Sequence, residues 1–103
     1  MSRIEKLQEL LQANAEDNFL QHALALEYIK IGNDEEAMGL FKRILKNDPG
    51  YVGSYYHLAK LMERMNMQGE AIEIYETGMA ECKKQNDRHA YNELQGALEE
   101  ITS

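Results

Sequence analysis

The chain has 103 residues, a length that allows one domain with a core of useful size. It carries 18 acidic against 11 basic residues, and the net charge of −7 argues against nucleic acid and anionic membranes as partners, since both require a basic surface. No stretch approaches the roughly twenty apolar residues of a membrane span, and the first residues lack the apolar run of a secretory signal. The single cysteine, Cys82, can form no internal disulfide, so we expect a reducing compartment and a cytoplasmic protein.

The first predicted element is a short helix over residues 2–13. Leu7, Leu10 and Leu11 recur at helical spacing and form one apolar face. The other positions are mainly polar, as an end helix of a stack requires.

A pair of helices is predicted over residues 18–51. Apolar residues fall at helical spacing on either side of a break at residues 32–34. Asn33 or Asp34 can cap the second helix, and the Pro-Gly pair at residues 49–50 ends it.

Residues 52–85 repeat the same pattern. Four residues recur unchanged thirty-four positions later, and the substitutions around them are mild. A fixed period of this length indicates stacked repeats, in which one helix pair cannot bury its apolar face alone. The identical pairs are Leu24/Leu58, Ala25/Ala59, Glu36/Glu70 and Ala37/Ala71.

The last predicted element is a helix within residues 86–103. Its apolar stripe consists of Tyr91, Leu94, Leu98 and Ile101. This stripe fits the repeat only if the connection before it gained about two residues. The opposite face is polar enough to close the stack.

The repeated residues follow a set order of large and small side chains. The first copy places Leu24, Ala25, Tyr28, Ala37, Phe41 and Pro49 at fixed offsets, and the second places Tyr55, Leu58, Ala59, Met62, Ala71 and Tyr75. This pattern resembles the tetratricopeptide repeat, a helix-turn-helix unit of the same period. The departures are Gln21 for the leading aromatic residue, Met62 for Tyr, Gly78 for Ala and Lys83 for the closing Pro.

The resemblance implies an all-α fold, a right-handed superhelical stack of antiparallel helix pairs with about six helices. We expect a single domain over residues 1–103. It would consist of an N-terminal half-repeat (1–17), two repeats (18–51 and 52–85) and a C-terminal capping helix (86–103).

In tetratricopeptide arrays the first helices of successive repeats line a concave groove that binds peptides. The resemblance therefore implies a non-catalytic scaffold or adaptor for a peptide or protein segment. Core positions repeat between the copies while groove positions differ, as they would on a binding face or on an unconstrained surface. The predicted groove residues are Phe19, His22, Leu26, Ile29, Lys30, Tyr56, His57, Lys60, Arg64 and His89.

His57, Lys60 and Arg64 are predicted to share one face of one helix and to form a cationic stripe in an acidic chain. Such a stripe would attract an acidic segment or a C-terminal carboxylate; the alternative is a solvated helix face that Glu63 partly neutralises. The three groove histidines could strengthen such binding below about pH 6.5, where imidazole gains charge. Their spacing matches no metal motif, so we expect neither a metal nor a cofactor.

Two interpretations of Cys82 remain open. Lys83 and Lys84 could lower the pKa of the Cys82 thiol and make it reactive, or the cysteine could be an inert residue near a helix end.

No phosphate-binding glycine loop and no nucleophile elbow is present, so no catalytic residue is predicted.

The competing function is a self-associating structural module. The six methionines and the apolar groove residues Phe19, Leu26 and Ile29 could form the face of a homodimer. A chaperone-like regulatory subunit is a further alternative that the sequence does not separate from an adaptor.

Overall fold

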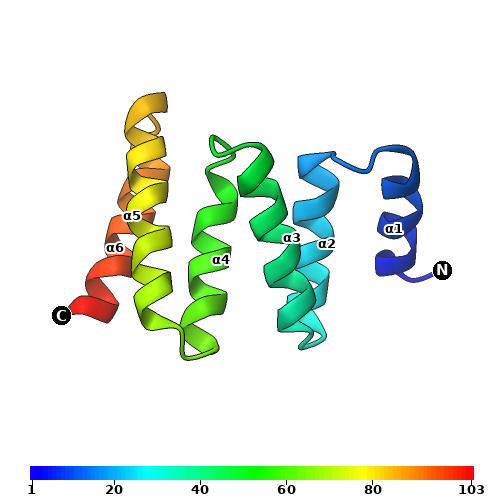
Figure 1. Cartoon of the computed structure of the whole chain (residues 1–103), viewed down its shortest axis with the longest axis horizontal. Coiled ribbons are helices and arrows are strands. Elements are labelled where there is room, and N and C mark those ends of the chain that lie inside the picture. Colours follow the sequence, from blue (N-terminus) through cyan, green and yellow to red (C-terminus); the bar gives the residue numbers. More distant parts are fainter. The chain divides into compact units, whose positions relative to one another are not determined.

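The computed structural model describes residues 1–103 and contains six helices and no strand (Figure 1). The predicted all-α fold with six helices is confirmed. By its contacts the chain divides into an N-terminal unit, Met1–Asn47, and a C-terminal unit, Asp48–Ser103. The helices are α1 (Arg3–Ala13), α2 (Asn18–Lys30), α3 (Asp34–Asn47), α4 (Gly53–Arg64), α5 (Gln68–Gln85) and α6 (Arg88–Thr102).

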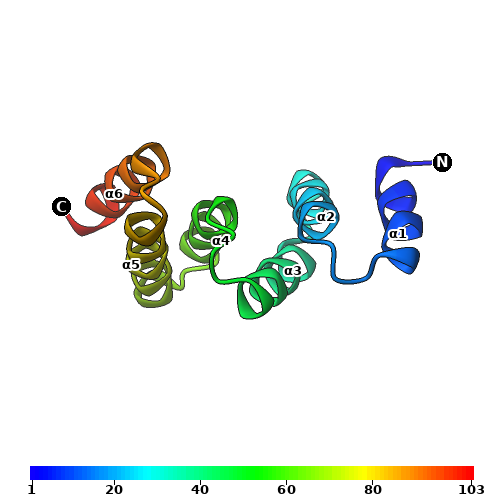
Figure 2. The ribbon, with the colours of Figure 1, turned by 90° about the horizontal axis from the view of Figure 1, so that it is seen from above.

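In the N-terminal unit, α2 packs against both α1 and α3 (Figure 2). The small cluster between α1 and α2 is centred on Leu7, Ala23 and Leu24. The predicted apolar face of α1 is partly wrong, because Leu10 leaves 48% of its surface exposed while Ile4 packs against the cluster instead. Leu7 and Leu11 keep their predicted places, so the buried face of α1 consists of Ile4, Leu7 and Leu11.

In the C-terminal unit, α5 packs against both α4 and α6, and α4 also contacts α6. Gly78 of α5 is buried at the closest approach of the three helices. A Cβ atom at this position would lie 2.8 Å from the Cβ of Tyr55 on α4 and 2.9 Å from a methyl carbon of Leu94 on α6. The absence of a side chain at Gly78 thus makes room for Tyr55.

The repeated core positions are occupied as the period predicts. Phe41 and Tyr75 stand thirty-four residues apart, and both are 0% exposed. The four alanines of the pattern, Ala25, Ala37, Ala59 and Ala71, are also 0% exposed, which is consistent with helices that approach closely at small residues. The two copies therefore place equivalent side chains in equivalent interior sites.

Three helix ends share one backbone geometry. In each, a residue with positive φ follows the helix, and the next backbone N–H donates to the carbonyl oxygen five residues earlier, as in a Schellman turn. The positive-φ residues are Gly32 (80°), Asn66 (62°) and Asn86 (58°). The bonds run from Asn33 to Tyr28 (2.9 Å), from Met67 to Met62 (2.8 Å) and from Asp87 to Cys82 (2.9 Å).

The two repeats end differently because only the first has a proline. α3 stops at Asn47, just before Pro49, whereas α5 runs through Lys83 to Gln85. Proline lacks a backbone N–H and cannot continue a helix, and lysine can. The buried Leu94 and Ala97 of α6 then stand thirty-six rather than thirty-four positions after Leu58 and Leu61, as the predicted two-residue insertion requires.

Candidate protein-binding faces

The first candidate site is a pocket of about 350 Å³ on α2, which we call the α2 face. Five groove residues were predicted on α2, and four of them line this pocket. The fifth, Ile29, is half-buried and lies outside the pocket. Arg3, from α1, and Glu27 complete the rim. The lining residues are Arg3, Phe19, His22, Ala23, Leu26, Glu27 and Lys30.

The α2 face has an aromatic centre. Phe19 lies in the first turn of α2 with 70% of its surface exposed, although most large apolar side chains of the chain are covered. His22 lies one turn further along α2, and its ring meets the buried Phe41 ring edge-on at 5.4 Å. That contact fixes the imidazole against the core of the unit, so His22 forms an anchored wall of the pocket.

At the rim of the α2 face, two basic side chains form ion pairs with the same carboxylate. The Glu27 Oε2 atom lies 3.3 Å from the Arg3 Nε atom and 3.0 Å from the Lys30 Nζ atom. The side chain of Glu27 is largely covered, while those of Arg3 and Lys30 are mostly exposed. One positive charge is therefore in excess beside the apolar centre, and it is available to an acidic group.

The second candidate site, the α4 face, consists of Tyr56, His57, Lys60 and Arg64. The Tyr56 and His57 rings meet edge-on at 5.6 Å, and the Lys60 Nζ atom lies 5.8 Å from the centre of the Tyr56 ring. The structure therefore brings the three central residues of this face together. Arg64 follows at the exposed end of α4.

The predicted cationic stripe on α4 is more strongly neutralised than the sequence indicated. The Lys60 Nζ atom lies 3.8 Å from Glu63 and 4.0 Å from Glu100, which α6 contributes. Glu63 also accepts a hydrogen bond from the buried Tyr75 hydroxyl. Carboxylates on two helices thus offset the lysine charge, and the expected attraction for an acidic segment is weaker here than at the α2 face.

The expected pH dependence of the groove histidines is not supported at His57. Burial lowers the pKa of the His57 imidazole, and the nearby Glu93 carboxylate opposes that shift only in part. His57 therefore gains its charge at a lower pH than an exposed histidine would. His89 is exposed on α6 and makes none of the ring contacts or ion pairs of the α4 face.

The proposed activation of Cys82 by Lys83 and Lys84 is wrong. The cysteine is 0% exposed, and burial together with the Asp87 and Glu81 carboxylates raises the pKa of its thiol. The Lys84 Nζ atom is turned to Glu81, 3.0 Å away, and therefore neutralises that carboxylate instead. Cys82 is the inert residue of the alternative interpretation.

Two further features bear on the kind of site the molecule can hold. No three histidine, cysteine, aspartate or glutamate side chains gather in a way that could hold a metal ion. None of the helices combines the length and apolar character needed to cross a membrane.

The family follows from the sequence itself. A family model described as tetratricopeptide repeat matches residues 1–74, well over half of the chain. The chain is a tetratricopeptide repeat protein. This family generally supplies non-catalytic modules for protein–protein interaction. A search of curated proteins found no match.

Solved structures of other proteins share the fold. The crystal structure of a tetratricopeptide repeat domain protein from Salinibacter ruber is 38% identical, covers 82% of this chain and 93% of that chain, and has a TM-score of 0.78. Its solution structure is 37% identical, with coverage of 84% and 87% and a TM-score of 0.81. A protein from Bordetella parapertussis, 22% identical, covers 98% and 88% with a TM-score of 0.84 and shows the fold alone.

Sequence reasoning on this tetratricopeptide repeat protein missed the residues that neighbouring helices bring to each face. Arg3 reaches the α2 face from α1, and Glu100 reaches Lys60 from α6. Glu27 was the one residue with a local signal, because it stands three positions before Lys30 and one helical turn after Ala23. The other two are distant in sequence, and only the packing of the helices reveals them.

Proposed function

We propose that the protein is a non-catalytic adaptor that binds a segment of another protein, with the α2 face as its principal contact. The observation that carries this proposal is the pocket on α2 with the exposed ring of Phe19 at its edge. Aromatic side chains beside a pocket are common anchors of protein interfaces, because they bury a large apolar area at low entropic cost. The general role of the family supports the same proposal.

The chemistry of the α2 face favours an apolar side chain next to a carboxylate. Phe19 and Leu26 would cover the apolar group, and Arg3 and Lys30, which share the single Glu27 carboxylate, would attract the acidic one. An acidic segment is therefore the proposed partner. The chain as a whole has a net charge of −7, so this excess of positive charge is local to the α2 face. It would favour acidic segments over other segments as partners.

The α4 face is proposed as a weaker, second contact for the same kind of segment. Tyr56, His57 and Lys60 form a packed aromatic and cationic group, but Glu63 and Glu100 offset the charge of the lysine. A carboxylate bound here would have to compete with those two groups for Lys60. Arg64 is the remaining cation on this face.

The test is to select peptides from a random displayed library on the wild-type protein and to titrate the best one against variants. Phe19→Ala should weaken binding about tenfold or more, because interface anchors contribute about 2 kcal/mol or more. Lys60→Glu combined with Arg64→Glu should weaken it less. The matched control is Lys42→Ala on the exposed surface of α3, which should bind like the wild type.

The outcome that contradicts the proposal is equally clear. Phe19 is exposed, so its replacement leaves the helices folded, and circular dichroism can establish this for each variant. If the library yields no enriched peptide, or if the selected peptides bind Phe19→Ala as tightly as the wild type, the α2 face is not the binding site.

A further inference from the structure

The helix α1 is joined to the rest of the N-terminal unit by a small interface. It packs mainly against α2, and Leu7 is its single buried residue, whereas α3 buries three residues. At the surface, Arg3 pairs with Glu27, and the Gln8 carboxamide donates a hydrogen bond of 3.0 Å to the Tyr28 hydroxyl. Because the burial of apolar area dominates the stability of such an interface, α1 is held in place less firmly than α3.

The connection between α1 and α2 is anchored without the help of α1. The Glu16 carboxylate accepts hydrogen bonds from the side chains of Arg43 and Asn47 on α3, the second at 2.7 Å. The carbonyl oxygen of Ala15 accepts a hydrogen bond of 2.6 Å from the buried Gln21 side chain on α2. Since these contacts tie the connection to α2 and α3, α1 can move away while the connection stays in place.

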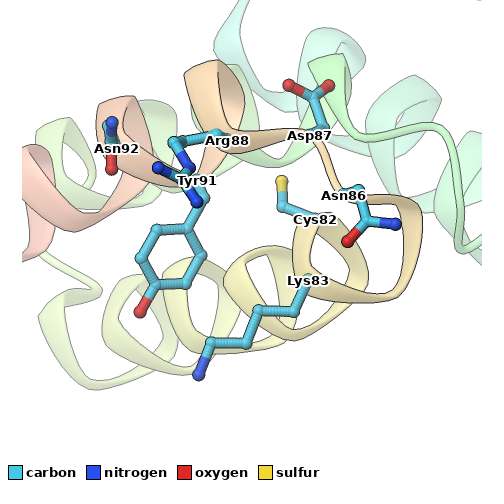
Figure 3. Close-up of a pocket in the computed structure, with 7 residues that line it drawn as sticks. All are labelled: Cys82, Lys83, Asn86, Asp87, Arg88, Tyr91 and Asn92. Atoms are coloured by element: carbon cyan, nitrogen blue, oxygen red, sulfur yellow. The ribbon is translucent and has the colours of Figure 1, made fainter.

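The last helix, α6, is fixed more firmly. It buries Leu94 and Ala97 and packs against both α5 and α4. Near its start, Tyr91 stands beside Lys83 of α5, whose Nζ atom lies 5.5 Å from the centre of the ring (Figure 3). Asp87 caps the helix through a hydrogen bond of 3.0 Å from the backbone N–H of the third helical residue. α6 therefore serves as an internal reference for the behaviour of α1.

The release of α1 would change the α2 face in two ways. Arg3 would leave with α1, and the Glu27 carboxylate would then pair with Lys30 alone, so the excess positive charge at the rim would be lost. Ala23 belongs both to the cluster under α1 and to the lining of the α2 pocket, so the apolar surface of the face would grow. The docked α1 thus makes the α2 face more basic and less apolar.

We propose that α1 opens as a separate unit and that Arg3 links its docked state to the binding of an acidic segment on the α2 face. The link to an acidic partner rests on the proposed function, whereas the opening of α1 does not. Arg3 is a specificity-determining residue, because an acidic group binds the docked form better than the released form. By thermodynamic linkage, the same partner holds α1 in place.

Amide hydrogen exchange of the full chain, followed by NMR, measures the opening of α1 without any ligand. Exchange rates are corrected for the intrinsic rate of each residue. We expect the amide of Leu11 in α1 to exchange about tenfold or more faster than those of Phe41 in α3 and Leu94 in α6. Equal protection in the three helices would mean that α1 opens only when the whole chain unfolds, and would overturn the proposal.

The charge preference of the α2 face is measured with two peptides whose ends are blocked, acetyl-Leu-Glu-Leu-Glu-amide and the neutral acetyl-Leu-Gln-Leu-Gln-amide. At physiological ionic strength, which screens distant acidic residues, we expect the wild type to bind the acidic peptide about two- to fivefold more tightly. Arg3→Ala should remove this preference, and Arg3→Lys should keep most of it. The matched control is Lys6→Ala, which removes an exposed cation of α1 that does not pair with Glu27 and should leave the preference unchanged.

Leu7→Ala tests the link itself, because Leu7 lies in the cluster under α1 and does not line the α2 pocket. This variant should release α1 and remove the preference for the acidic peptide, although it changes no residue of the face. The Phe41 amide should stay protected, since α2 and α3 remain folded. In the wild type, saturation with the acidic peptide should slow the exchange of α1 by the same factor of about two to five and leave that of α6 unchanged.

Each contrary result has a distinct meaning. A preference for the acidic peptide that survives in both Arg3→Ala and Leu7→Ala would overturn the link, and so would an exchange rate of α1 that saturation does not change. Loss of Phe41 protection in Leu7→Ala would overturn the separate opening of α1. If the wild type binds neither peptide at millimolar concentration, or shows no preference, the acidic partner of the proposed function is wrong and the link is wrong with it.

Discussion

At the scale of single residues, the two repeats divide the same interior space differently. Tyr55 stands at the position of Gln21 and Gly78 at the position of Ile44, thirty-four residues later in each case. The second repeat therefore combines a large aromatic residue with glycine, and the first a smaller polar residue with isoleucine. The close approach of Tyr55 and Leu94 to Gly78 explains why the alanine usual in the family is absent here.

The Gly78→Ala substitution tests this account of the packing. We expect it to lower the free energy of unfolding by about 1–3 kcal/mol, because the new methyl group would overlap Tyr55 and Leu94. Alanine is the better helix former by about 1 kcal/mol, so the loss would appear despite a favourable propensity. Urea unfolding followed by circular dichroism measures the difference.

Gly39→Ala on α3 is the matched control. Its Cβ would have no atom within 4 Å, and the position is exposed within a helix. We expect this variant to be more stable than the wild type by up to about 1 kcal/mol. Stabilisation by both substitutions would show that Gly78 is not held at a close contact.

At the scale of helices, the ends decide where each helix stops and how the next one starts. The turns after α2, α4 and α5 all use a residue with positive φ, but only the first of these residues is glycine. Asparagine tolerates the left-handed conformation better than other residues with a side chain, so Asn66 and Asn86 can replace glycine. The chemistry of the turn is thus conserved within the chain while the residue changes.

The α4–α5 turn gives a direct test. Asn66→Ala should destabilise the protein by about 1 kcal/mol, because alanine is strained at a φ of 62°. Asn66→Gly should be at least as stable as the wild type, because glycine adopts this conformation without a steric cost. Thermal melting of the two variants compares them at one position, and equal loss in both would point to a role of the asparagine side chain instead.

At the scale of the whole molecule, charge governs how copies of the chain meet. The net charge of −7 causes repulsion between molecules, whereas the exposed Phe19 ring on the α2 face would favour association. These opposing effects separate the adaptor from the self-associating module. In the adaptor, the α2 face is open to a partner; in the module, a second copy would cover it.

We expect the protein to be a monomer with a mass of 11.9 kDa in solution at low salt. Light scattering across a concentration series, at low and at physiological ionic strength, measures the mass directly. Since salt screens the repulsion, any association should increase with ionic strength. A tight dimer at low salt that Phe19→Ala converts to a monomer would favour the self-associating module.

Much of the fold could be predicted because it follows from local pattern. The thirty-four-residue period and the small residues such as Ala25 and Ala59 lie within segments where spacing along the chain sets spacing along a helix, and the break at residues 32–34 separates two such segments. The misjudged Leu10 shows the limit of that rule. Periodicity identifies the apolar residues that share a face of a helix, but the helix that packs against it decides which of them are buried.

The candidate sites were predictable only in part, for the same reason. Phe19, His22, Leu26 and Lys30 lie on one helix, so their shared face could be inferred from the family pattern. The carboxylate of Glu100 beside Lys60 and the guanidinium of Arg3 beside Glu27 depend on contacts between residues far apart in the sequence. The sequence by itself determined the helices and their repeat, because backbone hydrogen bonds and side-chain spacing are local. Only the tertiary structure decided the charge balance of each surface and the inertness of Cys82, because electrostatics and burial depend on what lies across the helix interface.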